Sequence, residues 1–255
     1  MKKPLILVVN DDGIFAPGIQ ALVEVVQEIG EVVIVAPDSP QSAKGHALTI
    51  SDPIRLNHDK KIFPHLEAYA CSGTPVDCVK LAKHVVLKGR KIDLCVSGIN
   101  HGSNASINIL YSGTMSAAME GSIEGIPSVG FSLLDFSFEA DFEHCKPFIK
   151  SICKIMLDNT LKTKLLNVNI PKLPLSEIKG MKVCRQAHAR WVEEFQENKD
   201  PFGRPYYWLT GKFVNLEEEA IDTDIWALNN GFVSIVPSFY DMTHYEGLEE
   251  VRNLF

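Results

Sequence analysis

Two adjacent carboxylates, Asp11 and Asp12, follow directly after a run of five apolar residues near the start of the chain. Burial disfavours an ionised carboxyl group, and two such groups side by side repel each other. A bound cation would remove that repulsion. The alternative is that Asp11, Asp12 and Gly13 form only an Asx-type turn ahead of a helix, since Asp and Gly are common in turns.

Oxygen-bearing side chains also follow two other apolar runs, at residues 32–36 and 92–96. In an open α/β sheet the carboxyl ends of the strands form one edge, where ligands bind. Carboxylate, hydroxyl and amide oxygens suit magnesium, manganese or calcium better than zinc. The sequence therefore predicts a divalent metal site at this edge, and its candidate ligands are Asp11, Asp12, Asp38, Ser39, Ser42, Ser97, Asn100 and Asn104.

A second candidate site is the segment Ser112-Gly113-Thr114, which opens a helix of small residues. Backbone N–H groups and hydroxyls at a helix N-terminus bind anions such as phosphate. The alternative is an ordinary Ser or Thr N-cap. His46 and His101 lie in candidate site loops, where each is either a phosphate donor or acid, or a solvated loop residue.

Aromatic residues gather in the last third of the chain. They could stack on a base, although a hairpin core or a subunit contact explains them as well. The residues concerned are Trp191, Tyr206, Tyr207 and Trp208.

The elements that must position these residues alternate between short apolar runs and helical periodicity. Strands are predicted at residues 5–9, 32–36, 92–96, 128–132 and 165–171, and helices at 17–29, 74–86, 113–125 and 141–158. This alternation predicts a three-layer α/β/α, Rossmann-like, doubly wound and mostly parallel sheet. After about residue 170, turn residues between short aromatic runs predict β-hairpins and an extended C-terminal arm. We expect one domain over residues 1–255, with a core at about 1–170 and the hairpins and arm at about 171–255.

Composition excludes several classes of function. A net charge of -7 and a pI of about 5.6 give no basic surface for a nucleic acid polymer. No stretch reaches the roughly 18 apolar residues of a membrane span. Six scattered cysteines without a CxxC pair indicate reduced, buried thiols, so we expect a cytoplasmic protein. The sequence lacks the glycine motifs of dinucleotide-binding and P-loop proteins and the G-x-S-x-G turn of α/β-hydrolases.

Five motifs in order resemble the SurE family of survival-protein 5'/3'-nucleotidases. They are "NDDGIFAPGIQAL", "VAPDSPQSAKGHALT", "SGTPVDCVKLA", "VSGINHGSN" and "YSGTMSAAMEG". The resemblance runs from about residue 5 to residue 130 and continues more weakly to "SIVPSFYDMT". It implies a metal-dependent phosphatase of nucleoside monophosphates, cytoplasmic, with a Rossmann-like fold and a C-terminal arm exchanged between subunits of a homodimer or homotetramer.

By motif position, the resemblance assigns one divalent cation, Mg²⁺ or Mn²⁺, to four ligands. These are Asp11, Asp12, Ser42 and Asn100, with Ser39 as a competitor for Ser42. It assigns phosphate contacts to Ser112, Gly113 and Thr114, and it implies that Asn10 contacts substrate or orients the carboxylate pair. It carries no catalytic role onto His101.

The predicted reaction is metal-assisted hydrolysis of a phosphate monoester. Asp11 or Asp12 would orient the attacking water as general base, and Asn100 would help to stabilise charge on the phosphoryl group. A covalent aspartyl-phosphate is an open variant. The other hypotheses are a phosphatase of short polyphosphates, a non-catalytic nucleotide-binding scaffold and a dinucleotide-dependent oxidoreductase, although the last lacks its glycine motif.

Overall fold

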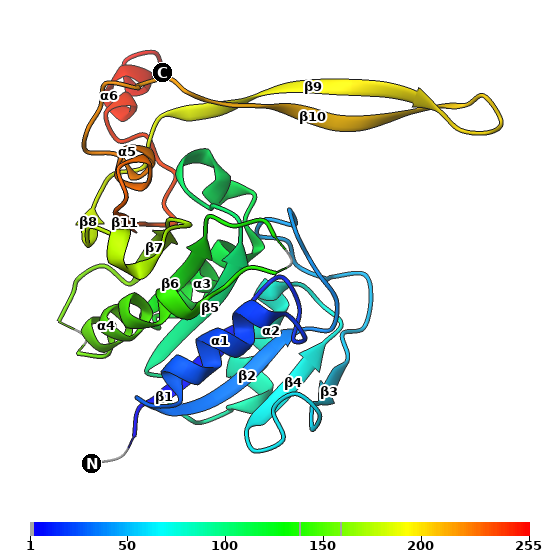
Figure 1. The fold of residues 1–255 in the computed structure, drawn as a ribbon, viewed down its shortest axis with the longest axis vertical. Helices are drawn as coiled ribbons and strands as arrows, with labels where there is room; N and C mark the ends of the chain where they lie inside the picture. The colour runs from blue at the N-terminus through cyan, green and yellow to red at the C-terminus, as the bar shows by residue number, and fades with distance from the viewer. Residues whose placement is uncertain (1–2, 138, 159) are drawn as a thin grey trace.

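A computed structural model of the protein describes residues 3–137, 139–158 and 160–255. Within these ranges nine strands form one mixed sheet in the order β3-β4-β2-β1-β5-β6-β7-β11-β8 (Figure 1). Neighbouring strands are parallel except in the pairs β3–β4 and β7–β11. The strands are β1 (Leu5–Val9), β2 (Glu31–Pro37), β3 (Leu56–His58), β4 (Glu67–Cys71), β5 (Leu94–His101), β6 (Ser128–Leu133), β7 (Leu165–Ile170), β8 (Met181–Val183) and β11 (Val233–Pro237).

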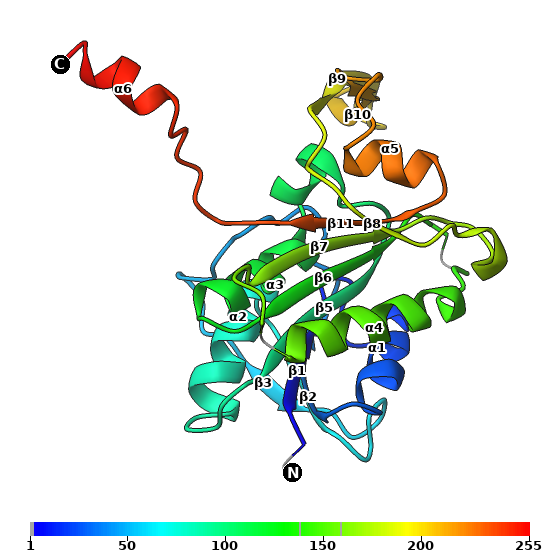
Figure 2. The ribbon, with the colours of Figure 1, turned by 90° about the vertical axis from the view of Figure 1, so that its left-hand side faces the viewer.

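Helices cover both faces of this sheet, which confirms the predicted three-layer architecture (Figure 2). On one face lie α1 (Pro17–Val26) and α4 (Lys146–Leu157), and on the other lie α2 (Pro75–Leu81) and α3 (Gly113–Ile123). Helix α1 is shorter than the helix predicted at residues 17–29, because residues 27–29 form a turn. A π-helical segment, Ala82–Val86, extends α2.

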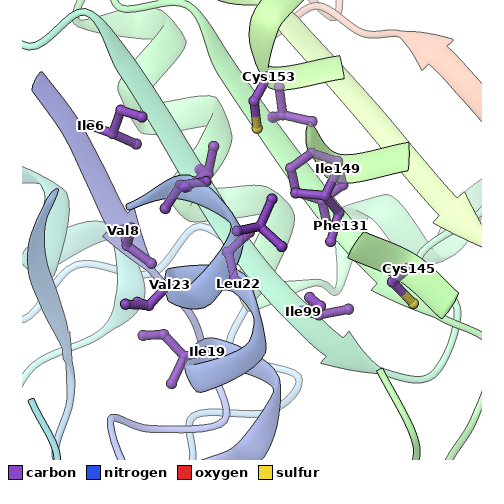
Figure 3. Close-up of a cluster of buried hydrophobic side chains, with 14 of the residues drawn as sticks. Ile6, Val8, Ile19, Leu22, Val23, Ile99, Phe131, Cys145, Ile149 and Cys153 are labelled. Carbon is purple, nitrogen blue, oxygen red and sulfur yellow. The ribbon is translucent and has the colours of Figure 1, made fainter. Parts of the chain in front are cut away.

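The core is divided by the sheet into two apolar layers. Ile6 and Val8 of β1 pack with Leu22 of α1 and Ile149 of α4 on one face (Figure 3). Leu7 and Val9 of β1 point to the opposite layer, under α2 and α3. Successive side chains of a strand face opposite ways, so a strand buried on both faces must be apolar throughout. This explains the unbroken apolar run before Asp11.

The order of the strands creates a switch point beside β1. The chain passes from β1 to β2 and β4 on one side and then returns to β5 on the other. Crossovers therefore leave the edge in opposite directions after β1 and β5, which opens a crevice where the two strands end. Asp11 and Asn100 stand at these two ends.

Strand β5 is longer than the predicted strand at residues 92–96. It continues through the polar segment to His101, and its pairing with β6 shifts register between Ser97 and Asn100. Asn100 still pairs with Ser132 beyond the shift. The strand thus carries its last polar side chains to the sheet edge, rather than ending before them in a loop.

The segment after residue 170 contains the predicted hairpin. β9 (Ala189–Lys199) and β10 (Pro205–Asn215) pair in antiparallel fashion and project from the body as a long arm (Figure 1). β8 and β11 of the same segment join the main sheet, and α5 (Asp224–Asn229) lies between the hairpin and β11. The final helix α6 (Gly247–Arg252) stands away from the body (Figure 2). The single domain over residues 1–255 stays a prediction.

Three short 3-10 segments complete the described structure: Ser106–Leu110, Glu143–Cys145 and Leu175–Glu177. None of the helices within the described ranges combines the length and the apolar character that a membrane crossing requires. All six cysteines are buried free thiols, as expected from their scattered positions.

Helix α2 begins with the N-cap predicted from Thr74 and Pro75. The Thr74 hydroxyl accepts a hydrogen bond from Asp77 N at 3.1 Å and donates one to Ala47 O at 2.8 Å. The Asp77 carboxylate in turn accepts from Thr74 N at 2.9 Å. This capping box therefore satisfies the helix terminus and also fixes the loop at residue 47.

We expect Thr74→Ala to lower the free energy of unfolding by about 1–2 kcal/mol, since the loss of an N-cap costs about that amount. Urea unfolding measured by circular dichroism tests this. Thr210→Ala is the control, because the Thr210 hydroxyl, on the exposed hairpin, donates to the backbone oxygen of Glu194 and caps no helix. Equal effects of the two substitutions would contradict the capping role.

Candidate metal and phosphate site

Asp11 is buried at the end of β1, with 4% of its surface exposed. Its Oδ1 accepts a short hydrogen bond from the Thr114 hydroxyl, at the start of α3. Its backbone oxygen accepts from Gln41 N at 2.7 Å, in the loop after β2. Asp11 therefore joins the ends of β1 and β2 to the N-terminus of α3.

The ionised forms of both carboxyl groups are disfavoured in this environment. Burial, and then the adjacent charge of Asp12, raise the pKa of Asp11 from 3.8 to about 6. Burial also raises the pKa of Asp12. The His101 backbone N–H donates to Asp12 Oδ2 at 3.4 Å, which is a long bond. This agrees with the sequence argument that the pair requires a positive partner.

The two asparagines present amide oxygens to the same corner. Asn10 Nδ2 donates to Gly13 O at 2.8 Å, whereas its buried Oδ1 has no hydrogen-bond partner within the described residues. Asn100 Nδ2 donates to Gly102 O at 2.8 Å and to His101 O at 3.2 Å. These bonds orient the Asn100 amide so that Oδ1 remains as an acceptor. Asn100 is therefore better placed as a cation ligand than as a donor to phosphate.

Ser39 and Ser42 both lie in the loop after β2, and both line a cavity of about 420 Å³ with Asp12 and His101. The Ser39 hydroxyl donates to Asp38 Oδ1 at 2.9 Å. The Ser42 hydroxyl makes no hydrogen bond to any residue that the structure describes. The Ser39 oxygen also accepts from Gln41 Nε2 at 3.4 Å. Of the two serines, only Ser42 therefore has an oxygen free of hydrogen bonds to the described residues.

The segment Ser112-Gly113-Thr114 forms the N-terminus of α3 directly against Asp11. Ser112 is the N-cap, and its hydroxyl accepts from Met115 N at 3.0 Å. A Cβ on Gly113 would lie 2.6 Å from the Cβ of Asp11, so only glycine permits this approach. The Thr114 hydroxyl is directed to Asp11. The structure thus brings the predicted anion-binding segment to the carboxylate pair.

A cavity of about 300 Å³ joins these residues. It is lined by Asp11, Asn100 and Ser112, and also by residues that were not predicted from the sequence to belong to the site, among them Tyr111, Asn108 and Phe136. Tyr111 directly precedes Ser112, and that adjacency is the one sequence signal that could have identified it. Trp191, considered in the sequence for base stacking, also lines this cavity.

The ring nitrogens of His46 and His101 both contact other groups of the protein. His46 Nε2 lies 2.9 Å from the buried carboxylate of Glu120 on α3, which Lys80 also contacts at 2.5 Å. His101 Nδ1 lies 3.1 Å from Ser137 O, and its ring packs edge-on against Phe142. Of two other strand-end candidates, Asn104 Nδ2 donates to Ser132 Oγ at 2.8 Å. Ser97 is fully buried, and its hydroxyl has no hydrogen-bond partner among the described residues.

These residues fit a divalent cation. The buried Asp11 and the half-buried Asp12 favour a positive partner, and Asn10 Oδ1 is a buried acceptor without a partner within the described ranges. Every donor atom is an oxygen, as magnesium and manganese prefer. No cluster of three or more His, Cys, Asp or Glu side chains suited to a metal occurs among the described residues. The fit therefore depends on Ser and Asn oxygens beside the two carboxylates.

Comparison with known proteins points to a single family. The family model for survival protein SurE matches residues 6–193. A protein of Christiangramia forsetii named 5'-nucleotidase SurE is 60% identical over 99% of this chain and 97% of its own length. A protein of the same name from Cytophaga hutchinsonii is 58% identical over 99% of this chain and 97% of its own length. The crystal structure of the SurE protein from Aquifex aeolicus superposes with a TM-score of 0.84 at 42% identity, covering 98% of this chain and 99% of that one.

Proposed function

Because the chain belongs to the SurE family, we propose that it is a metal-dependent phosphomonoesterase that removes phosphate from nucleoside 5'- and 3'-monophosphates. The observation that carries this proposal is the contact between the buried Asp11 carboxylate and the N-terminus of α3. A cation on the carboxylate pair and a phosphate at the helix terminus would be neighbours.

The proposed ligands of one divalent cation, Mg²⁺ or Mn²⁺, are Asp11, Asp12, Ser42 and Asn100. When bound, such a cation acts as a Lewis acid and lowers the pKa of water. The chain supplies uncommitted oxygens at Ser42 and Asn100, and the Asn100 amide is oriented by two backbone carbonyls.

The chain's own residues would orient the reactants. Helix α3 leaves its first N–H groups without intrahelical partners, so Gly113 and the Ser112 hydroxyl can bind phosphoryl oxygens. The Thr114 hydroxyl holds Asp11 in place. Asp12, the more exposed carboxylate, is the better general base for an attacking water, since Asp11 Oδ1 already accepts the hydrogen bond from Thr114.

Phosphate release from a panel of 5'- and 3'-nucleoside monophosphates tests the function. The assay is run with Mn²⁺ or Mg²⁺ and again with chelator. We expect release that depends on the metal and is lost in chelator. Folded protein that releases no phosphate from any nucleotide with either metal would overturn the proposal. Release from short polyphosphates alone would instead indicate a polyphosphatase.

We expect Ser42→Ala to raise the Mn²⁺ concentration for half-maximal activity about tenfold, a loss of about 1.4 kcal/mol in metal binding. Ser39→Ala is the matched control, three residues away on the same loop and already bonded to Asp38. It should leave the metal requirement unchanged. A larger rise in the half-maximal Mn²⁺ concentration for Ser39→Ala than for Ser42→Ala would assign the ligand role to Ser39.

A homodimer or homotetramer is part of the same proposal. Apolar side chains are exposed along the hairpin and the C-terminal segment, including Phe195, Phe202, Met242 and Tyr245. Exposed apolar surface of this kind is typical of subunit contacts. Light scattering after gel filtration measures the subunit number. We also propose a cytoplasmic location, in which the six thiols stay reduced.

A further inference from the structure

The cavity beside Asp11 has an aromatic wall that phosphate transfer alone does not require. Trp191 of β9 and Tyr111 line the same cavity of about 300 Å³ as Asp11, Asn100 and Ser112. Phosphate-binding groups and aromatic rings therefore face one continuous space, large enough to be a small-molecule site. A phosphate monoester bound there would place the rest of its molecule among the rings.

The indole of Trp191 is fixed in orientation. Its Nε1 donates to Asn108 Oδ1 at 2.8 Å, and its ring packs edge-on against Phe213, with 5.6 Å between the ring centroids. Its one polar atom is thereby used within the protein. The side chain lines the cavity and has 43% of its surface exposed, so it can offer a ligand aromatic contact rather than a hydrogen bond from Nε1.

The base of the hairpin is anchored to the segment that leads into the phosphate-binding helix. The Ser106 hydroxyl donates to Ala187 O at 2.7 Å. The buried carboxylate of Asp224 accepts from Ser106 N at 2.7 Å and from Ala187 N at 3.0 Å. Trp191 is thus held four residues beyond a rigid junction, so its position relative to Ser112 is set by the fold.

We propose that Trp191 is the stacking platform for the nucleobase of the substrate, and this inference rests on the proposed nucleotidase function. The site would distinguish nucleotides from base-free phosphate esters through stacking. Discrimination between bases would be small, because every base has a π face and the indole N–H is already bonded. Tyr111 and Phe136 complete the apolar wall of the cavity.

Steady-state kinetics with the metal-loaded, full-length protein test the inference. Two ligands are compared, adenosine 5'-monophosphate and ribose 5-phosphate, and the latter is used as a substrate or as a competitive inhibitor. We expect Trp191→Leu to lower the preference for the nucleotide about tenfold or more, mainly through KM, since loss of stacking on one base has an effect of that size. Trp191→Phe should recover most of the preference.

Trp208→Leu is the matched control, because Trp208 lies on the same hairpin, outside the cavity lining, and packs against Tyr206. It should leave the preference unchanged. If Trp191→Leu weakens the binding of both ligands equally, or of neither, the inference is overturned. The proposed function would still stand in that case, provided that the wild-type protein hydrolyses nucleotides. Wild-type protein that hydrolyses no nucleotide would overturn both.

Discussion

Asp11→Asn should lower kcat by about a hundredfold or more and, in the presence of chelator, make the protein more stable. The loss of turnover follows because Asp11 joins the carboxylate pair to the N-terminus of α3, and removal of one preorganised electrostatic group costs about that much in rate. Phosphate release under saturating metal measures the first effect. Urea unfolding in chelator measures the second.

The gain in stability has an electrostatic origin. Burial and the charge of Asp12 raise the pKa of Asp11 to about 6. A carboxyl group whose pKa is raised on folding favours the folded state at low pH, and this contribution is lost as the pH rises through about 6. At pH 8 without metal, the buried charge therefore opposes folding. Asn removes it, and we expect a gain of about 1–3 kcal/mol.

Asp52→Asn is the control, because Asp52 is exposed in a loop away from the cavity. It should change neither turnover nor stability. Full activity in folded Asp11→Asn protein would exclude Asp11 from the reaction. Lower stability of that variant in chelator would instead show that the charge on Asp11 strengthens its hydrogen bond from Thr114 by more than burial and repulsion cost.

Gly18→Ala should lower the free energy of unfolding by at least about 2 kcal/mol, although alanine is the better helix former. A Cβ on Gly18 would lie 2.0 Å from the backbone oxygen of Ile99. Helix α1 must therefore move away from β5. Because α1 follows Asp12 and β5 carries Asn100, the same movement separates the two sides of the site, and kcat should fall as well.

Gly125→Ala provides the comparison for this steric effect. Gly125 has φ +79° and no atom within 4 Å of the position that a Cβ would take, so only backbone strain applies, at about 1 kcal/mol. Urea unfolding ranks the two variants. A Gly18→Ala protein that is as stable as the wild type or more so would show that helix propensity prevails and that α1 and β5 are not in close contact.

The parts of the fold that follow local rules were predictable from the sequence. The run of apolar residues before Asp11 predicted a strand buried on both faces, and Thr74 with Pro75 predicted the start of α2. Strand β5 was predicted too short, because its last polar residues resemble a loop. Their pairing with β6 is a long-range interaction that no local pattern reveals.

The candidate site likewise has a part that was predictable from the sequence and a part that was not. The ends of β1 and β5 were placed together by the general topology of α/β sheets, so the proximity of Asp11 to the segment at Ser112 was expected. For Trp191 the sequence left base stacking, a hairpin core and a subunit contact open. Its position at the cavity depends on Asp224, which bonds to residues 106 and 187 far along the chain. Only the folded structure shows that this hairpin residue shares a cavity with Asp11.

The central claim is that the pair Asp11 and Asp12 holds a catalytic divalent cation at the end of β1. Electron paramagnetic resonance of Mn²⁺ titrated into the protein tests it most directly, since bound and free Mn²⁺ give different signals. We predict one bound Mn²⁺ per wild-type chain and loss of this binding in Asp12→Asn, with circular dichroism unchanged. Equal Mn²⁺ binding by the two proteins would contradict the account.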